Sequence, residues 1–277
     1  LQERGAIETD EGVLSGLLQA LMHGADEDTA LSLTRSVLDK NLPSLDDTLI
    51  TLLEKARRPK LDAVLDALDA SRLARRGLLV RAFRWQVPAI RKVLHLPEKQ
   101  QIARMAAAKI PNHASLFISI GTTTEEVAKA LYQHRGLKVI TNNLNVASIL
   151  YGNKGFEVIL AGGVVRRRDG GIIGPLTIDF IQQFRVDYGV IGISGIDLDG
   201  TLLDYDYREV RAARAIIDNS RRVFMVTDHT KFGRNAMVRL GSIDEIDALF
   251  TDRRPPQPLD ETLKAAEVAL HVTGAEM

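Results

Sequence analysis

The sequence contains no cysteine among its 277 residues. This absence excludes disulfides, cysteine-ligated zinc and thiol catalysis, and it is compatible with the reducing cytoplasm, where we expect the protein to act. No apolar run approaches the roughly 20 residues that a membrane-spanning helix requires, so no membrane contact is expected. The amino-terminal residues lack a basic stretch followed by an apolar one, so we expect no signal peptide either.

Net charge is also absent, because 36 Lys and Arg balance 36 Asp and Glu. A surface for nucleic acid would therefore have to be local. Residues 1–56 hold four basic and eleven acidic residues, whereas residues 57–92 hold ten basic and three acidic ones. Aromatic residues are scarce before Phe117, where only Phe83 and Trp85 occur. These shifts predict a domain boundary near residues 92–97.

The apolar pattern changes at the same boundary. Helical spacing dominates up to residue 75, and from residue 98 helices alternate with short apolar strands, which is typical of an α/β fold with a parallel-rich sheet and flanking helices. We expect a helical amino-terminal region at 1–92, an α/β domain at 96–256 and a carboxyl-terminal helix or tail at 257–277. The expected strands are 115–120, 137–140, 156–160, 188–193, 222–227 and 246–250, and the expected helices are 98–110, 125–131, 146–151, 178–184, 207–219 and 259–270.

Glycine and polar residues follow five of these strands. They are Gly121–Thr124, Thr141–Asn143, Gly162-Gly163, Ser194–Asp197 and Asp228–Arg234. Ligands of open parallel α/β sheets bind outside the carboxyl ends of the strands. The sequence therefore predicts one ligand site at this edge of the sheet.

The segment Gly121-Thr122-Thr123-Thr124 opens a helix, where backbone N–H groups, hydroxyls and the helix dipole favour a phosphate. An ordinary strand–helix turn with a threonine cap explains the same residues. The segment is neither a Walker loop nor a dinucleotide fingerprint.

Three further features allow both a functional and a structural interpretation. Lys231 is either a partner for a ligand anion or a solvated loop lysine. The basic turn Arg166–Gly171 either orders over a ligand or is a plain surface turn. Glu209 either binds ligand hydroxyls or complements the dipole of its helix. No catalytic triad and no metal-ligand spacing is visible around His113, His134 or His229, so we predict neither a catalytic residue nor a metal site.

Several motifs in combination resemble the effector-binding domain of the DeoR family of transcriptional regulators over about residues 96–256. They are Ile118–Thr123, Thr141–Ala147, Ala161–Gly163, Arg168–Gly174, Gly192–Asp197 and Lys231–Val238. The resemblance implies a fold like that of ribose-5-phosphate isomerase and a sugar- or polyol-phosphate inducer, with glycerol 3-phosphate as the favoured candidate and no cofactor. It also implies a homodimer or homotetramer on palindromic operator DNA. Residues matched to the effector site are Gly121, Thr122, Thr123, Asn142, Asn143, Gly162, Gly163, Ser194, Asp197, Glu209 and Lys231.

The amino-terminal region departs from the family pattern. A winged helix-turn-helix is expected there, but only Leu73–Phe83 resembles its recognition-helix end and wing, and Arg84-Trp85-Gln86-Val87 stands where a Gly-Gly string is expected. A one-base shift of one possible coding sequence for these four residues reads Gly-Gly-Lys. Part of residues 1–95 is therefore either a frame-shifted reading or a different helical domain.

Residues 57–92 carry a surplus of seven positive charges, ten minus three. These charges either attract nucleic-acid phosphates without sequence specificity or form a basic helix face that is solvated. We expect weakened or absent operator binding and preserved inducer binding. Two alternatives remain: a sugar-phosphate isomerase, although residues 198–208 lack the expected lysine, and a ligand sensor without DNA contact. The candidate DNA contacts are Arg72, Arg75, Arg76, Arg81 and Arg84.

Overall fold

The structure, a computed structural model, describes residues 95–274. The expected amino-terminal helices, the winged-helix remnant and the five candidate DNA-contact arginines lie outside these residues. No helix in the described part of the chain is long and apolar enough to cross a membrane.

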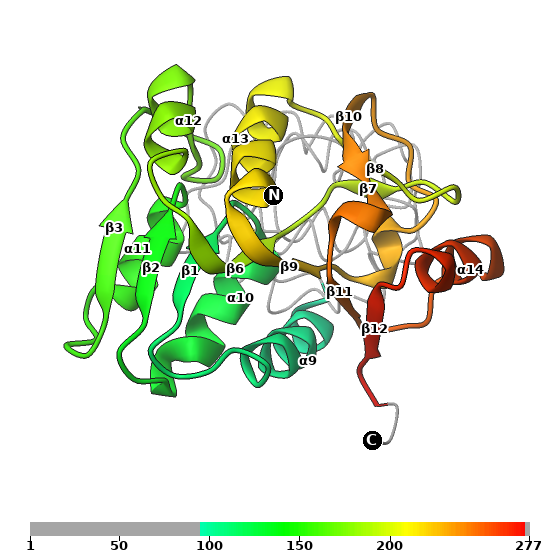
Figure 1. Cartoon of the computed structure of the whole chain (residues 1–277), viewed down its shortest axis with the longest axis horizontal. Coiled ribbons are helices and arrows are strands. Elements are labelled where there is room, and N and C mark those ends of the chain that lie inside the picture. Colours follow the sequence, from blue (N-terminus) through cyan, green and yellow to red (C-terminus); the bar gives the residue numbers. More distant parts are fainter. Residues whose placement is uncertain (1–94, 275–277) are drawn as a thin grey trace, which may run out of the picture. The chain divides into compact units, whose positions relative to one another are not determined.

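A seven-stranded sheet forms the centre of the described residues, with the strand order β12-β11-β9-β6-β1-β2-β3 (Figure 1). All six neighbouring pairs are parallel. The chain adds strands from β1 towards β3 and then crosses to β6, so the order reverses between β1 and β6. The strands are β1 Ser115–Ile118, β2 Lys138–Thr141, β3 Glu157–Leu160, β6 Val186–Ile191, β9 Ser220–Val226, β11 Ala248–Thr251 and β12 Ala269–Val272.

Helices cover both faces of this sheet, which explains why its central strands are nearly continuous apolar runs. On one face the buried side chains include Ile102, Val127 and Leu150, from three helices in turn. On the other face Ile181 and Ile216 belong to a second cluster. The helices of the first face are α9 Leu96–Ala107, α10 Thr122–Ala130 and α11 Leu144–Leu150, and those of the second are α12 Pro175–Ile181, α13 Tyr207–Asp218 and α14 Gln257–Ala265.

Alternation along the strands assigns each side chain to one of these two clusters. In β1, Leu116 and Ile118 face the first cluster and Phe117 faces the second, and all three are at most 1% exposed. Burial of such side chains contributes about 25 cal/mol per Å² of apolar surface. The sheet is therefore a rigid base for the loops at its carboxyl end.

Two small antiparallel sheets stand apart from the central sheet. Strands β7 Gly195–Ile196, β8 Thr201–Asp204 and β10 Val238–Ser242 form one of them, in the order β10-β8-β7. Strands β4 Val164–Val165 and β5 Ile172–Ile173 form the other, a hairpin inserted between β3 and α12. Both sheets consist of segments that follow the carboxyl ends of central strands.

The expected α/β class is confirmed, and each of the six expected strands has its counterpart in the central sheet. The expected helix at 259–270 is wrong in its second half. The helix α14 ends at Ala265, and after Glu267, whose φ is +57°, the chain forms β12 at the edge of the sheet. The hairpin β4–β5 and the sheet β10-β8-β7 were not predicted; β4, β5 and β7 are only two residues long, too short for an alternating pattern.

Candidate effector site at the carboxyl end of the sheet

The reversal of strand order brings the loops after β1 and β6 side by side. A side chain added at Gly192, after β6, would lie 3.5 Å from the carbonyl oxygen of Ile120 and 3.7 Å from Thr124. The loops after β2 and β3 follow on one side and that after β9 on the other, as the strand order requires. The structure therefore gathers the five predicted segments at one edge of the sheet.

The segment after β1 leaves the amino end of α10 without a side-chain cap. Gly121 has φ +153°, a conformation that favours glycine. The hydroxyl of Thr124 is fully buried and donates to the carbonyl oxygens of Ser119 and Gly121, at 2.8 and 2.7 Å. Thr122 is half-buried and Thr123 is buried. Thr124 thus fixes the turn, and the first N–H groups of α10 keep no intrahelical acceptor.

Both asparagines after β2 are buried and only partly satisfied. Asn142 donates from Nδ2 to the carbonyl oxygen of Ile172 at 3.1 Å, but its Oδ1 has no partner. Asn143 caps α11, accepting at Oδ1 from the N–H of Asn145 at 2.9 Å, but its Nδ2 has no partner. Buried polar atoms are hydrogen-bonded in the great majority of cases. The two unpaired atoms therefore mark this strand end as a place where a polar ligand would find partners.

The two glycines after β3 differ in their surroundings. A side chain at Gly163 would meet Thr177 Oγ1 at 2.3 Å and the carbonyl oxygen of Ile173 at 2.9 Å, and its φ is +144°. Thr177 donates to the carbonyl oxygen of Gly162 at 2.8 Å. Nothing lies within 4 Å of a side chain added at Gly162. Packing alone thus explains Gly163, whereas Gly162 faces open space.

The predicted residues after β6 separate into two environments. Ser194 is half-buried and donates to Asp204 Oδ1 at 3.1 Å. Asp197 is exposed in the turn between β7 and β8, where its carboxylate accepts the N–H of Leu198 at 2.8 Å. Ser194 therefore contacts an acidic cluster, whereas the carboxylate of Asp197 stabilises its own turn.

Arg166 holds that acidic cluster together from the turn of the hairpin. Its guanidinium donates to Asp169 at 2.7 Å, to Asp206 at 3.1 Å and to Glu209 at 2.6 Å, and its side chain is only 9% exposed. Burial lowers the pKa of Arg166, but Glu209 and Asp169 outweigh this and raise it overall. The basic turn is thereby fixed to the first turn of α13, a contact that the sequence did not predict.

Glu209 titrates near neutrality in this cluster. Burial and the negative charge of Asp204 raise its pKa, Arg166 lowers it, and the result is a pKa of about 7 against an ordinary 4.5. A carboxyl group in this state both donates and accepts hydrogen bonds near neutral pH. It matches hydroxyl groups, which also do both.

Lys231 lies at the end of a short 3-10 helix, His229–Lys231, after β9. Burial raises the pKa of Asp228, but Lys231, a hydrogen bond from Thr230, and then Lys99 and His95 lower it to about 2. Asp228 and Lys99, which lies on α9, are 3% and 4% exposed. A buried carboxylate thus stands between the predicted ligand cation and the helix that opens the described domain.

Sequence reasoning missed Lys99, Asp204, Asp206 and Asp228 as parts of these two clusters. Asp228 was visible directly after its strand, and Asp204 and Asp206 lie in the stretch 198–208 that was searched only for lysine. Lys99 gave no signal, because a lysine on an amphipathic helix is normally solvated.

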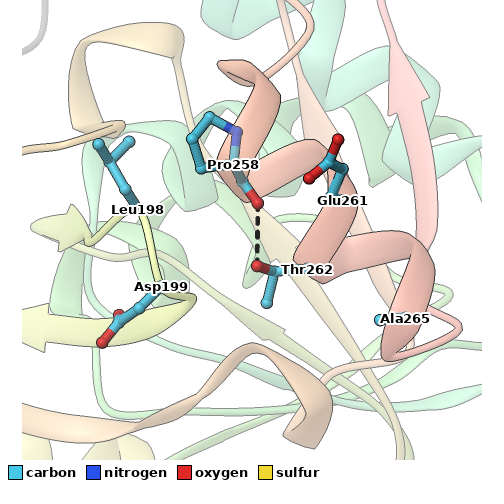
Figure 2. Close-up of a pocket in the computed structure, with 6 residues that line it drawn as sticks. All are labelled: Leu198, Asp199, Pro258, Glu261, Thr262 and Ala265. Carbon is cyan, nitrogen blue, oxygen red and sulfur yellow. Dashed lines mark hydrogen bonds between the residues drawn. The ribbon is translucent and has the colours of Figure 1, made fainter.

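Two grooves of measurable size lie away from these residues. One, of about 550 Å³, lies between the β7–β8 turn and α14 (Figure 2). It is lined by apolar groups and by Asp199 and Glu261, so no cation there would hold a phosphate. The other, of about 350 Å³, lies at the amino end of the sheet beside Arg221 and Arg222. Among residues 95–274 no group of acidic and histidine side chains could hold a metal ion.

Comparison with known proteins decides the family. A sequence profile of the DeoR C-terminal sensor domain matches residues 94–253, which is more than half of the chain. The chain belongs to the DeoR family of transcriptional repressors. It is 56% identical over 182 residues to the glycerol-3-phosphate regulon repressor of Escherichia coli (strain K12), covering 66% of this chain and 72% of that protein.

Other DeoR-family relatives match the chain over different lengths. The glycerol-3-phosphate regulon repressor of Haemophilus influenzae is 53% identical over 165 residues, or 60% of this chain and 64% of that one. The transcriptional repressor CsqR of Escherichia coli (strain K12) is 35% identical over 242 residues, or 81% and 93%. All three are named as repressors, which disfavours the isomerase alternative.

Among solved structures, the ribose 5-phosphate isomerase A of Neisseria gonorrhoeae is weakly similar, with 12% identity, a TM-score of 0.36 and coverage of 48% of this chain and 52% of that one. Another is a translation initiation factor eIF-2B of Pyrococcus horikoshii OT3, with 16% identity, a TM-score of 0.44 and coverage of 87% and 95%.

Proposed function

We propose that this DeoR-family repressor senses a small phosphate ester, with glycerol 3-phosphate as the first candidate, at the carboxyl end of its central sheet. The observation that carries the proposal is the parallel pairing of β1, β2, β3, β6 and β9, which brings the five predicted segments to one edge, together with the reversal of strand order between β1 and β6. Relatives that are 56% and 53% identical are named after the glycerol-3-phosphate regulon, which supports this choice of ligand.

Each half of such a ligand has a chemical match in the proposed site. The uncapped amino end of α10 and Lys231 suit a phosphate. The Arg166 cluster suits the hydroxylated half, because Glu209 donates and accepts near neutral pH. The proposed contacts are Gly121, Thr122, Thr123, Asn142, Asn143, Gly162, Gly163, Ser194, Asp197, Glu209 and Lys231. The weakest cases among them are Asp197, which is exposed and bonded within its own turn, and Gly163, whose position is explained by packing.

Calorimetric titration tests the proposal directly. We expect saturable heat with glycerol 3-phosphate, and weaker heat with fructose phosphates, deoxyribose phosphate and inorganic phosphate. The absence of saturable heat with every phosphate ester would refute phosphate sensing. Saturation by deoxyribose phosphate but not by glycerol 3-phosphate would keep the site and replace the ligand.

We also propose that operator binding is weaker than in a repressor with a complete winged helix. The supporting observation is the string Arg84-Trp85-Gln86-Val87 in place of the expected glycines. Basic side chains supply salt-sensitive attraction to phosphates but no base-specific readout. An electrophoretic mobility shift on a palindromic operator and on a scrambled duplex should give similar, weak affinities that fall steeply with salt. Tight binding of the operator alone would contradict this.

A further inference from the structure

The turn of the hairpin β4–β5 lies against the predicted ligand end of the sheet. Its residue Gly171 forms an antiparallel bridge with Asn143, which follows β2. Asn145 Nδ2 donates to the carbonyl oxygen of Asp169 at 2.9 Å and to Glu125 Oε1 at 2.8 Å. Asp169 belongs to the hairpin turn and Glu125 to the first turn of α10. The charged cluster at this turn therefore borders the predicted phosphate position at the start of α10.

Two buried amide atoms beside this hairpin have no partner among the described residues. Asn142 Nδ2 donates to the carbonyl oxygen of Ile172 on β5, so its Oδ1 is the atom that can still accept. Asn143 Oδ1 accepts the N–H groups of Asn145 and Val146, so its Nδ2 is the atom that can still donate. Backbone partners thus fix the orientation of both amides. One acceptor and one donor suit hydroxyl groups, which do both, whereas a carboxylate only accepts.

The charge at the hairpin turn comes from four carboxyl and three guanidinium groups, which together form the Arg166 cluster. They are Asp169, Asp204, Asp206 and Glu209, with Arg166, Arg168 and Arg208. Of the three cations only Arg166 is buried, with 9% of its side chain exposed, and it already bonds to three of the carboxylates. Arg168 and Arg208 are 35% and 50% exposed, so water screens their charges. The interior of the cluster therefore carries an excess of negative charge.

We propose that the Arg166 cluster selects the ligand by charge: it admits a phosphate monoester whose far end carries hydroxyl groups, and it rejects one whose far end carries a second anion. This inference rests on the proposed function, because the phosphate has to be held at the start of α10 for its far end to reach the cluster. Glu209, on the first turn of α13, sets the selection, since burial and the charge of Asp204 hold the pKa of its carboxyl group at about 7.

A carboxylate at the far end of the ligand lacks the interactions that are open to a hydroxyl group. It has no proton to donate to Asn142 Oδ1. It also lies beside ionised carboxylates, and like charges placed side by side in a binding site reduce affinity strongly. A hydroxymethyl group in the same place donates to Asn142 Oδ1 and accepts from Asn143 Nδ2 or from protonated Glu209.

Glycerol 3-phosphate and 3-phosphoglycerate are a matched pair of probes, because they differ only where a carboxylate replaces the terminal hydroxymethyl group. Calorimetric titration of the full-length protein at about pH 8 should give an affinity for glycerol 3-phosphate about 10- to 100-fold above that for 3-phosphoglycerate. Equal affinities would overturn the charge selection and leave phosphate sensing intact. Binding of neither ligand would overturn the proposed function and this inference with it.

The pH dependence of this affinity ratio tests Glu209 in the wild type. The charged groups that face Glu209 are Arg166, Arg168 and Asp169 of the hairpin turn and Asp204 of β8. Glu209 gains negative charge as pH rises through its pKa of about 7, so the preference for glycerol 3-phosphate should grow several-fold from about pH 6 to about pH 8. The titration of the phosphate is common to both ligands and cancels in the ratio. A ratio that stays constant with pH would overturn the role of Glu209.

Glu209→Gln removes the charge of this side chain and keeps one donor and one acceptor. The variant should show a smaller preference for glycerol 3-phosphate than the wild type, and this preference should no longer change with pH. Glu261→Gln is the matched control, because Glu261 lies exposed on α14, outside the Arg166 cluster, and should keep the wild-type ratio at each pH.

Circular dichroism verifies the folding of both variants. A folded Glu209→Gln variant with the wild-type ratio and the wild-type pH dependence would contradict the assignment. If this variant does not fold, the ratio in the wild type and its change with pH decide the question, because neither measurement requires a substitution.

Discussion

The two ends of the central sheet differ in how far their polar groups are hydrogen-bonded within the protein. At the amino end, the Ser115 hydroxyl donates to Asp187 at 2.6 Å and accepts the N–H of Asp187 at 3.0 Å, and its bonds lower the pKa of that carboxyl. At the carboxyl end, Asn142 and Asn143 keep buried atoms without partners, and the pKa of Glu209 is raised. One end satisfies its polar groups internally, whereas the other leaves capacity for a ligand.

Gly163 is an exception to this comparison, because it lies at the ligand end of the sheet but is required for close packing against Thr177. Gly163→Ala should destabilise the fold by about 2–4 kcal/mol, from backbone strain and the clash with Thr177. Gly162→Ala is the matched control and should leave stability unchanged, since nothing lies within 4 Å. Thermal unfolding measures both. If Gly162→Ala also weakens ligand binding in calorimetry, Gly162 borders the ligand; equal stability losses for both variants would contradict the distinction.

Lys231→Met tests the ligand end at its predicted cation. Loss of a charge-assisted hydrogen bond, about 1.5–3 kcal/mol, should weaken glycerol 3-phosphate binding about 10- to 100-fold in calorimetry. Lys264→Met is the control, because Lys264 pairs with Asp260 on α14, outside the predicted site. Lys231→Arg should restore part of the affinity. Equal affinities of the Met variant and the wild type would remove Lys231 from the site.

The pH dependence of the unfolding free energy tests Glu209 at the ligand end. Its folded-state pKa, about 7, lies above the ordinary 4.5, so the native state retains a proton that the unfolded chain releases. The stability from this group is therefore complete below the ordinary pKa and is lost as pH rises through about 7. The unfolding free energy of the wild type minus that of Glu209→Gln should fall by on the order of 2 kcal/mol from about pH 5 to about pH 8.

Denaturant unfolding of both proteins at each pH measures this difference. A difference independent of pH would mean that Glu209 stays ionised in the native state. Arg214→Met, which breaks ion pairs with Asp218 and Glu245, serves as a control with no such slope between about pH 5 and about pH 8.

Ser115→Ala probes the amino end and should give the smallest effect. Two hydrogen bonds between Ser115 and Asp187 are lost at a half-buried position, which costs about 1 kcal/mol of unfolding free energy. Affinity for glycerol 3-phosphate should be unchanged. A change in affinity without a change in stability would show that the two ends of the sheet are coupled.

Much of the fold was predictable because its strands are buried on both faces. Leu116, Phe117 and Ile118 form a continuous apolar run, and such runs alternating with helices imply a parallel sheet. The two antiparallel additions escaped prediction, since Val164–Val165 and Gly195–Ile196 are only two residues long. The strand β12 was read as the end of a helix because Ala269 and Leu270 continue a helical spacing.

The candidate site was predictable where it depends on position along the chain, and less so where it depends on side-chain direction. Polar residues after β1, β2, β3, β6 and β9 had to meet at one edge. The carboxylate of Asp197 stabilises its own turn, and the electrostatic interaction of Asp228 with Lys99 of α9 depends on packing between distant segments. No local pattern encodes such contacts.

The pairing of β1 with β6 also has a consequence for folding kinetics. The bonds between Ser115 and Asp187 join residues 72 positions apart, whereas β1, β2 and β3 are joined by single helical crossovers. Closing a long loop is entropically slower than closing short ones. The pairing of β1 with β6 therefore forms late in folding. A ligand bound by loops that follow both strands would slow the separation of β1 from β6. Bound ligand would thereby protect the native chain against proteolysis.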